Sequence, residues 1–159
     1  YGLVTRVARY HNVYGPHGPW TGGREKAPAA VCRKVAEAAL SGDHRIEIWG
    51  DGRQTRSFMY IDDCLHGTRM IMDGDSGVPV NLGSSELVSI NQLVDLVEQI
   101  AGIRCERRYR LDAPQGVRGR NSDNTLIREL YGWEPSIPLI DGLERTYAWV
   151  YDQVKRAHQ

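Results

Sequence analysis

Residues 22–30 read Gly22-Gly23-Arg24-Glu25-Lys26-Ala27-Pro28-Ala29-Ala30, a stretch that begins in a glycine-rich loop and ends in a helix. Pro28 suits the first turn of that helix, because its fixed φ angle is already helical. Lys26 lies at the junction, close to the backbone N–H groups that a helix N-terminus offers to an anion. The stretch therefore predicts a junction that carries an anion contact or a proton donor.

A strand is predicted before this junction and a helix is predicted through it. Residues 3–10 are expected to form a buried strand, and residues 11–24, which are rich in glycine and proline, are expected to form a loop. Residues 28–40 are predicted to form a helix that Gly42 ends. Strand, loop and helix in this order are typical of an α/β protein.

The same alternation continues to the end of the chain and predicts an α/β fold. Further strands are predicted at residues 45–49, 54–60, 79–82 and 105–110, and further helices at 62–72, 89–101, 123–132 and from 141 onward. Gly50-Asp51-Gly52 lies between the first two of these strands and predicts a hairpin. Helix caps are predicted by Asp62, by Ser89 with Gln92, and by Asp141 with Glu144.

The composition of the chain argues against several classes of protein. Twenty Lys and Arg residues balance twenty Asp and Glu residues in a chain of 159 residues. A neutral chain is not a general binder of nucleic acid or of membrane surfaces. No apolar run approaches the roughly 20 residues that span a bilayer. Cys32, Cys64 and Cys105 are widely spaced, which predicts reduced thiols in a cytoplasmic protein and no metal site.

Hydrogen-bonding groups gather in two places near the opening stretch. Residues 9–16 close the first strand, and ligands of open α/β sheets lie beyond the carboxyl ends of strands. The residue types alone favour a simpler interpretation, a strand end followed by an Asn-containing turn. Lys34 lies just over two helical turns after Lys26, so two cations share one side of the helix. An anionic ligand would explain them, although solvated surface lysines are the common alternative.

Two further segments carry groups that bind phosphate or sugar. Gln54 and Arg56 lie two residues apart on one strand and share a face, either as ligand contacts or as an exposed polar edge. Residues 116–123 place two arginines among glycines, which suits close approach to a phosphate or simply forms a mobile basic loop. The other aromatic candidates are predicted to be core or core-edge residues: Trp49, Trp133 and Trp149.

Together these motifs resemble the latter half of the extended short-chain dehydrogenases/reductases that act on nucleotide sugars. The resemblance covers almost the entire chain and rests on residues 9–16, 50–58, 60–63, 79–84 and 130–135. Two narrower stretches, residues 22–30 and 116–124, resemble the GDP-mannose 3,5-epimerase family. The resemblance implies one unit, residues 1–159, that combines the last Rossmann strands (about 1–16 and 78–84) with a smaller substrate-binding α/β domain.

The same resemblance implies a function. Members of that family epimerise GDP-mannose at C3 and C5 to GDP-L-galactose, in ascorbate biosynthesis, through transient NAD-dependent oxidation at C4. Lys26 would be the proton donor, and Tyr10 and His11 would lie close to the nicotinamide of NAD. The residues implied to bind the GDP-sugar are Asn12, Glu25, Lys26, Ala27, Lys34, Gln54, Thr55, Arg56 and Arg120, the last near the diphosphate.

The resemblance also implies parts that this sequence does not show. The glycine-rich dinucleotide fingerprint and the catalytic cysteine are expected in an N-terminal half that is missing here, and NAD is expected to be bound mainly by that half. We therefore expect the 159-residue chain to be inactive alone and to associate, because a strand without its sheet exposes apolar surface. The alternatives are another nucleotide-sugar 4-epimerase or 4,6-dehydratase, or a non-catalytic nucleotide-sugar-binding module.

Overall fold

The computed structural model describes residues 2–114 and 116–158, and its fold is mixed α/β, as the alternation of elements predicted. The helices are α1 (Ala27–Ser41), α2 (Ile61–Asp73), α3 (Ile90–Ala101), α4 (Thr125–Tyr131) and α5 (Leu139–Ala157). The strands are β1 (Ala8–Tyr10), β2 (Val13–Tyr14), β3 (Arg45–Trp49), β4 (Thr55–Ser57), β5 (Met59–Tyr60), β6 (Val80–Leu82), β7 (Leu87–Ser89), β8 (Glu106–Arg110) and β9 (Gly119–Arg120). Within the described residues, no helix combines the length and the apolar character that a membrane crossing requires.

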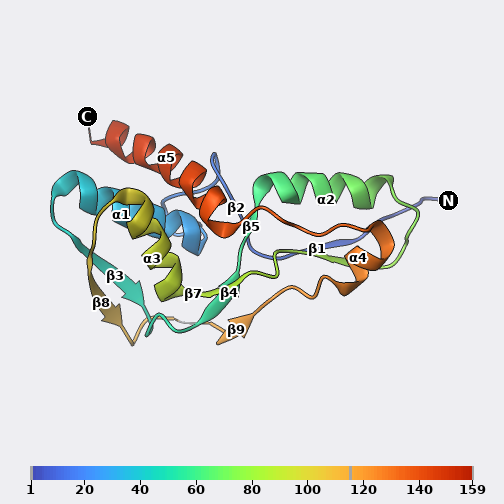
Figure 1. Ribbon diagram of the computed structural model, residues 1–159, viewed down its shortest axis with the longest axis horizontal. Coiled ribbons are helices and arrows are strands. Elements are labelled where there is room, and N and C mark those ends of the chain that lie inside the picture. Colours follow the sequence, from blue (N-terminus) through green and yellow to red (C-terminus); the bar gives the residue numbers. More distant parts are fainter. Residues whose placement is uncertain (1, 115, 159) are drawn as a thin grey trace.

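The elements form two lobes along the long axis of the molecule (Figure 1). One lobe holds α1, α3 and α5 with the parallel pair β3–β8. The other lobe holds the parallel pair β1–β6 with α2 and α4. The parallel pair β2–β5 and the three-stranded sheet β7–β4–β9 lie between them. Each lobe has its own apolar core, one around Val35 and Leu143 and one around Leu82 and Ile127.

Helix α1 forms as predicted. Lys26 is its N-cap residue and Pro28 lies in its first turn. Gly42 ends the helix with a φ of 72°, in the left-handed region that glycine adopts without strain. The apolar face of α1, which includes the fully buried Val35, packs against α3 and α5. This packing holds Lys26 at a fixed place on the surface of the lobe.

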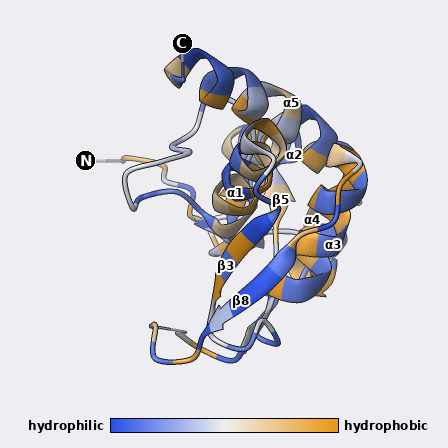
Figure 2. Ribbon diagram, turned by 90° about the vertical axis from the view of Figure 1, so that its left-hand side faces the viewer, coloured by the Kyte–Doolittle hydropathy of each residue, from blue (hydrophilic) through white to orange (hydrophobic). Residues whose placement is uncertain are grey.

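Helix α3 begins at the predicted capping box. Ser89 Oγ accepts the N–H of Gln92 at 3.1 Å, and Gln92 Oε1 accepts the N–H of Ser89 at 2.8 Å. Hydrophobic and hydrophilic residues both occur along the helix in Figure 2, as expected for one face in the core. Val94 and Val97 on that face are fully buried. The capping box therefore fixes the start of a helix that closes one side of the core.

The hairpin predicted around Gly50-Asp51-Gly52 does not form. β3 instead runs parallel to β8, while β4 pairs antiparallel with β7 and parallel with β9. The turn itself is present, but it bonds to the start of α3, where the N–H of Asn91 donates to Gly52 O at 2.9 Å. The prediction was wrong because a tertiary contact separates the two strands after the turn.

Strand β1 is shorter and more exposed than the buried strand predicted over residues 3–10. Only Ala8–Tyr10 is a strand, and Leu3 is 82% exposed. Among the described residues, β1 has β6 as its one neighbouring strand. Burial of a parallel strand requires neighbours on both sides, which a local sequence pattern does not specify.

Two of the predicted helix caps are wrong. Asp62 lies in the first turn of α2, not at its N-cap, and pairs with Arg145 at 3.3 Å. The predicted capping box of Asp141 with Glu144 is displaced, because α5 already begins at Leu139. Glu86, distant in sequence, accepts the N–H of Leu139 at 2.8 Å and satisfies the start of that helix. Both helices therefore start before the residue that was predicted to cap them.

Candidate functional site

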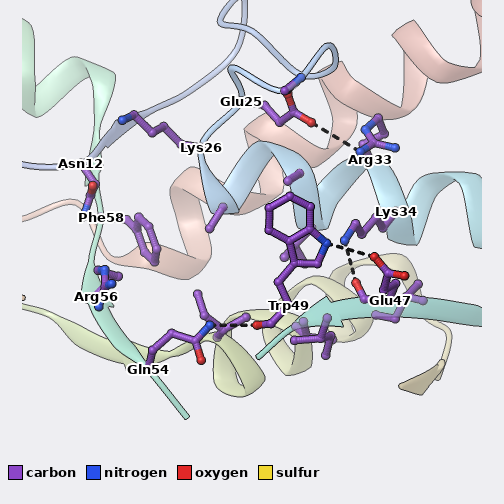
Figure 3. A pocket seen from close by; sticks show the side chains of 18 of the residues that line it. Asn12, Glu25, Lys26, Arg33, Lys34, Glu47, Trp49, Gln54, Arg56 and Phe58 are labelled. Atoms are coloured by element: carbon purple, nitrogen blue, oxygen red, sulfur yellow. Dashed lines mark hydrogen bonds and ion pairs between the residues drawn. The ribbon is translucent and has the colours of Figure 1, made fainter. Parts of the chain in front are cut away.

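A pocket of about 520 Å³ lies between the N-terminal half of α1, the open edge of β3, and β4 (Figure 3). Two side chains bind backbone carbonyls on this edge of β3. Lys34 Nζ donates to Glu47 O at 2.6 Å, and Gln54 Nε2 donates to Trp49 O at 3.0 Å. The apolar lining includes Ala30, Val31, Ile46, Ile48, Phe58, Ile90, Val94 and Pro114.

Most of the residues predicted to bind a GDP-sugar line this one pocket. They come from the loop after β1, from the start of α1 and from the region of β4, segments that are far apart in the sequence. The predicted residues in the lining are Asn12, Glu25, Lys26, Ala27, Lys34, Gln54 and Arg56. Convergence of distant polar groups on a partly apolar cavity is typical of small-molecule sites.

Lys26 presents a free cation to this pocket. Its side chain extends from the N-terminus of α1 toward Asn12 (Figure 3). Asn12 is itself held by β4, since its Nδ2 donates to Ser57 O at 3.1 Å. Across residues 2–114 and 116–158, no hydrogen bond or ion pair engages the Lys26 ammonium. An unpartnered ammonium at a pocket wall can donate a hydrogen bond, or a proton, to a ligand.

Glu25 shapes the glycine loop beside Lys26. Its Oε2 accepts the N–H of Gly23 at 2.7 Å, and its Oε1 pairs with Arg33 at 3.5 Å. Hydrogen bonds from its own backbone N–H and from Gly23, together with the Arg33 charge, lower the pKa of this carboxyl group. Glu25 is therefore an ionised lining group whose oxygens already hold the loop that leads into α1.

Lys34 is the second lysine of the pocket, and it is half-buried. Burial lowers the pKa of this ammonium, and the nearby Glu47 carboxylate opposes that shift. Its bond to Glu47 O leaves further N–H donors, because an ammonium carries three. Lys34 thus brings a fixed cation from α1 to the edge of β3.

Two arginines stand side by side at the junction of β4 and β9. Arg56 and Arg120 are register partners on these parallel strands, so their side chains leave the sheet on the same face. The Arg56 guanidinium donates to Thr55 O at 2.6 Å and to Val117 O, which ties β4 to the glycine loop. Arg120 is exposed and lies outside the pocket lining. The pair forms a positive rim next to the cavity, suited to a phosphate.

Besides Arg120, three predicted site residues lie away from the pocket lining. Thr55 leaves β4 on the face opposite Arg56, over Gly119. Tyr10 is 53% exposed, and its hydroxyl bonds to Thr68 Oγ1 at 2.9 Å beside α2. His11 packs against Gly83 and has a buried Nδ1 with no hydrogen-bond partner among the described residues.

Trp49 and Glu47 are among the lining residues that the sequence analysis did not predict. Trp49 was predicted to be a core or core-edge aromatic, which is wrong, because its side chain is 53% exposed and lines the pocket. Glu47 also lines the pocket, and its Oε1 accepts the Trp49 Nε1–H at 3.0 Å. The alternation along β3 could have indicated their exposure. Ile46 and Ile48 are buried, so Glu47 and Trp49, at the alternate positions, occupy the opposite face of the strand.

Comparison with known proteins gives two kinds of match. Residues 1–83 match the model of the NAD dependent epimerase/dehydratase family. Over 156 residues the chain is 48% identical to a protein of Oryza sativa subsp. indica named GDP-mannose 3,5-epimerase 1. That alignment covers 98% of this chain and 40% of the relative, so the chain spans well under two thirds of the relative's length.

Solved structures share the fold. UDP-glucose 4-epimerase of Thermotoga maritima, with UDP-glucose, matches with a TM-score of 0.81 and 29% identity, covering 93% of this chain and 46% of that chain. UDP-glucuronic acid 4-epimerase of Bacillus cereus, with UDP-glucuronic acid and NAD, matches with a TM-score of 0.80 and 27% identity, covering 95% and 46%. The predicted fold class is confirmed by these matches.

Proposed function

The chain belongs to the NAD dependent epimerase/dehydratase family, and from this premise we propose that its pocket holds the GDP-sugar of an epimerase that converts GDP-mannose to GDP-L-galactose. The observation that carries the proposal is the convergence of Asn12, Lys26 and Arg56 on one cavity of about 520 Å³. The 48% identity to a protein named GDP-mannose 3,5-epimerase 1 supports this choice of sugar nucleotide.

Lys26 is assigned the proton-donor role. Inversion at C3 and C5 of the sugar requires one group that removes a proton and one that returns it. Bound NAD would oxidise C4 transiently, which makes the protons on C3 and C5 more acidic. Lys26 is suited to return a proton because its ammonium has no polar partner among the described residues and extends into the pocket. Asn12 beside it would hold a sugar hydroxyl.

The diphosphate is assigned to the rim of Arg56 and Arg120. Their parallel register brings two guanidinium groups together, which matches the charge of a diphosphate bridge. The Arg56 bonds to Thr55 O and Val117 O keep that guanidinium in place before a ligand arrives. Thr55, on the other face of β4, would contribute through its backbone carbonyl, which accepts from Arg56.

For NAD, the residues present fit one wall of a site. The unpartnered Nδ1 of His11 needs a hydrogen-bond partner, which a bound ligand can supply. Burial first, and then the charges of Arg120 and Arg9, lower the pKa of His11, which favours the neutral ring. Tyr10, adjacent in sequence, is half-exposed. We propose that most NAD contacts come from the portion of the relatives' length that this chain does not span.

A hybrid enzyme tests the proposal. In it, this chain replaces the matching 40% of the rice relative, and conversion of GDP-mannose is followed by chromatography. We expect the hybrid to epimerise GDP-mannose. The Lys26→Met hybrid is expected to lose turnover at least a hundredfold while its Kd for GDP-mannose changes less than about threefold, since general acid catalysis is worth about 10²–10⁴-fold.

Lys155→Met, at an exposed position in the last turn of α5, is the matched control and should turn over normally. Unchanged turnover in the Lys26→Met hybrid would remove the proton-donor assignment. If neither hybrid bound GDP-mannose, the pocket assignment would be wrong.

A second candidate is a nucleotide-sugar 4-epimerase or 4,6-dehydratase with a UDP-sugar substrate. The observation in its favour is the TM-score of 0.81 to UDP-glucose 4-epimerase, over 93% of this chain. Titration of the chain with GDP-mannose and UDP-glucose separates the two candidates, because the proposed function requires tighter binding of GDP-mannose.

A further inference from the structure

One arginine of α1 holds both ends of the short loop that leads into this helix. The Arg33 guanidinium donates from Nε to Trp20 O at 3.2 Å and from Nη2 to Glu25 Oε1 at 3.5 Å, the second contact being drawn in Figure 3. Its Nη1 donates to both carboxylate oxygens of Glu37, four residues further along α1, at 3.1 Å. The segment from Trp20 to Glu25 is therefore attached to α1 through this side chain.

Packing does not hold the glycine turn within this loop. Gly22 and Gly23 have φ angles of 88° and 83°, in the left-handed region that favours glycine. A Cβ placed on either glycine would meet no heavy atom beyond its chain neighbours within 4 Å among the described residues. Polar contacts shape the turn instead, because Glu25 Oε2 accepts the N–H of Gly23 at 2.7 Å while Arg33 engages the other oxygen.

Glu25 is directly followed by Lys26, and the two residues line the same pocket wall. The Glu25 carboxylate is ionised, and each of its oxygens is engaged by a group other than Lys26. The Lys26 ammonium consequently has no partner among the described residues, although a carboxylate is its neighbour in the chain. The contact between Arg33 and Glu25 is what separates these two opposite charges.

We propose that Arg33 is a positioning residue, which holds the Glu25 carboxylate away from Lys26 and so leaves the Lys26 ammonium free. The inference rests on the proposed function, in which Lys26 returns a proton to the sugar. Without Arg33, Glu25 would lose its charged partner, and the glycine turn would let the carboxylate rotate toward Lys26. A lysine at position 33 would not replace the arginine, because an ammonium lacks the planar fork that reaches Trp20 O, Glu25 and Glu37 together.

Amine labelling of the 159-residue chain tests the inference without any ligand. The chain is treated with a limiting amount of N-acetoxysuccinimide, and acetylation of each lysine is followed by mass spectrometry. Lys155, exposed in the last turn of α5, is the internal reference. In Arg33→Ala, acetylation of Lys26 should slow about threefold relative to Lys155, the protection expected of one partly exposed ion pair with Glu25. Adding Glu25→Gln to Arg33→Ala should restore the wild-type ratio.

Glu37→Gln is the matched control, because it removes another carboxylate partner of the same guanidinium, outside the pocket lining. It should keep the wild-type labelling ratio. If Arg33 were only a structural tie, Arg33→Ala would show the opposite sign, since a loosened loop exposes Lys26 further and speeds its acetylation. Faster or unchanged labelling of Lys26 in Arg33→Ala, or labelling as slow in the double variant, would overturn the inference.

In the hybrid enzyme, the same substitution should act on kcat and not on KM. Arg33→Ala should lower kcat for GDP-mannose about threefold and change KM less than about twofold, because it acts on the proton donor and leaves the other ligand contacts in place. Wild-type kcat in Arg33→Ala, beside lost turnover in Lys26→Met, would overturn the inference and leave the proposed function intact. Normal turnover in Lys26→Met, with slowed labelling in Arg33→Ala, would instead overturn the proton-donor role.

Discussion

At the scale of single residues, the site depends on which polar groups already have partners. Glu25 and Arg56 form hydrogen bonds that hold the loops beside the pocket. The Lys26 ammonium, in contrast, has no partner among the residues the structure describes. Lys34 combines both properties, because its ammonium donates one hydrogen bond to β3 and has further N–H donors that remain available for a ligand. This difference divides the predicted residues into groups that build the pocket and groups that can act on a ligand.

Replacement of Arg120 by alanine should weaken GDP-mannose binding about tenfold, because a charge-assisted hydrogen bond is worth roughly 1.5–3 kcal/mol. Calorimetry on the 159-residue chain measures the change. Arg118→Ala removes the same charge from the same loop, two residues away, and should have a smaller effect. Equal affinities for wild type and Arg120→Ala would contradict the phosphate contact.

At the scale of elements, the start of α3 forms part of the pocket wall and holds the turn after β3 in place. Ser89 and Gln92 cap the helix, and Asn91 in its first turn bonds to Gly52 in the turn after β3. Ile90 and Val94 of the same helix line the pocket. Helix α1 contributes in the same way through its N-terminus, where Lys26 is the N-cap residue. Capping interactions thus determine the positions of the elements that form the pocket walls.

Removal of the Ser89 hydroxyl should therefore destabilise the protein by about 1 kcal/mol, the usual effect of losing an N-cap side chain. Urea unfolding of Ser89→Ala measures this free energy. Ser85→Ala is the control at a nearby exposed position and should change stability by less than about 0.5 kcal/mol. If the two variants unfolded alike, the capping box would not hold α3 in solution.

At the scale of the whole molecule, apolar surface remains open on the β1 lobe. Leu3, Val4 and Val7 are exposed beside β1, which pairs only with β6 among the described residues. Arg6 Nε bonds to Gly74 O at 2.7 Å and anchors this segment to the end of α2. Self-association through the edge of β1 stays a prediction, because an unpaired edge strand is a template for pairing.

The chain alone should bind GDP-mannose but should not convert it. The pocket lies within this chain, whereas the proposed NAD site has one wall here, and oxidation at C4 requires the complete site. Incubation of the purified chain with GDP-mannose and NAD, followed by chromatography of the sugar nucleotides, measures this. Any formation of a new sugar nucleotide would contradict the prediction.

The sequence by itself determined the elements whose signals are local. The α1 segment with Pro28 and Gly42, the capping box of Ser89 with Gln92, and the turn at residues 50–52 all stand where they were predicted. The α/β class followed from their order along the chain. Most of the residues that the family resemblance implies for substrate binding also line one pocket.

Only the tertiary structure decided how those elements meet. The parallel pairing of β3 with β8, the Glu86 carboxylate at the start of α5, and the exposure of Trp49 depend on partners far away in the sequence. Strand neighbours set burial, and a side chain from another element can replace a local cap. A local pattern fixes which face of a strand a residue occupies, but the packed fold decides whether that face meets core, solvent or a ligand pocket.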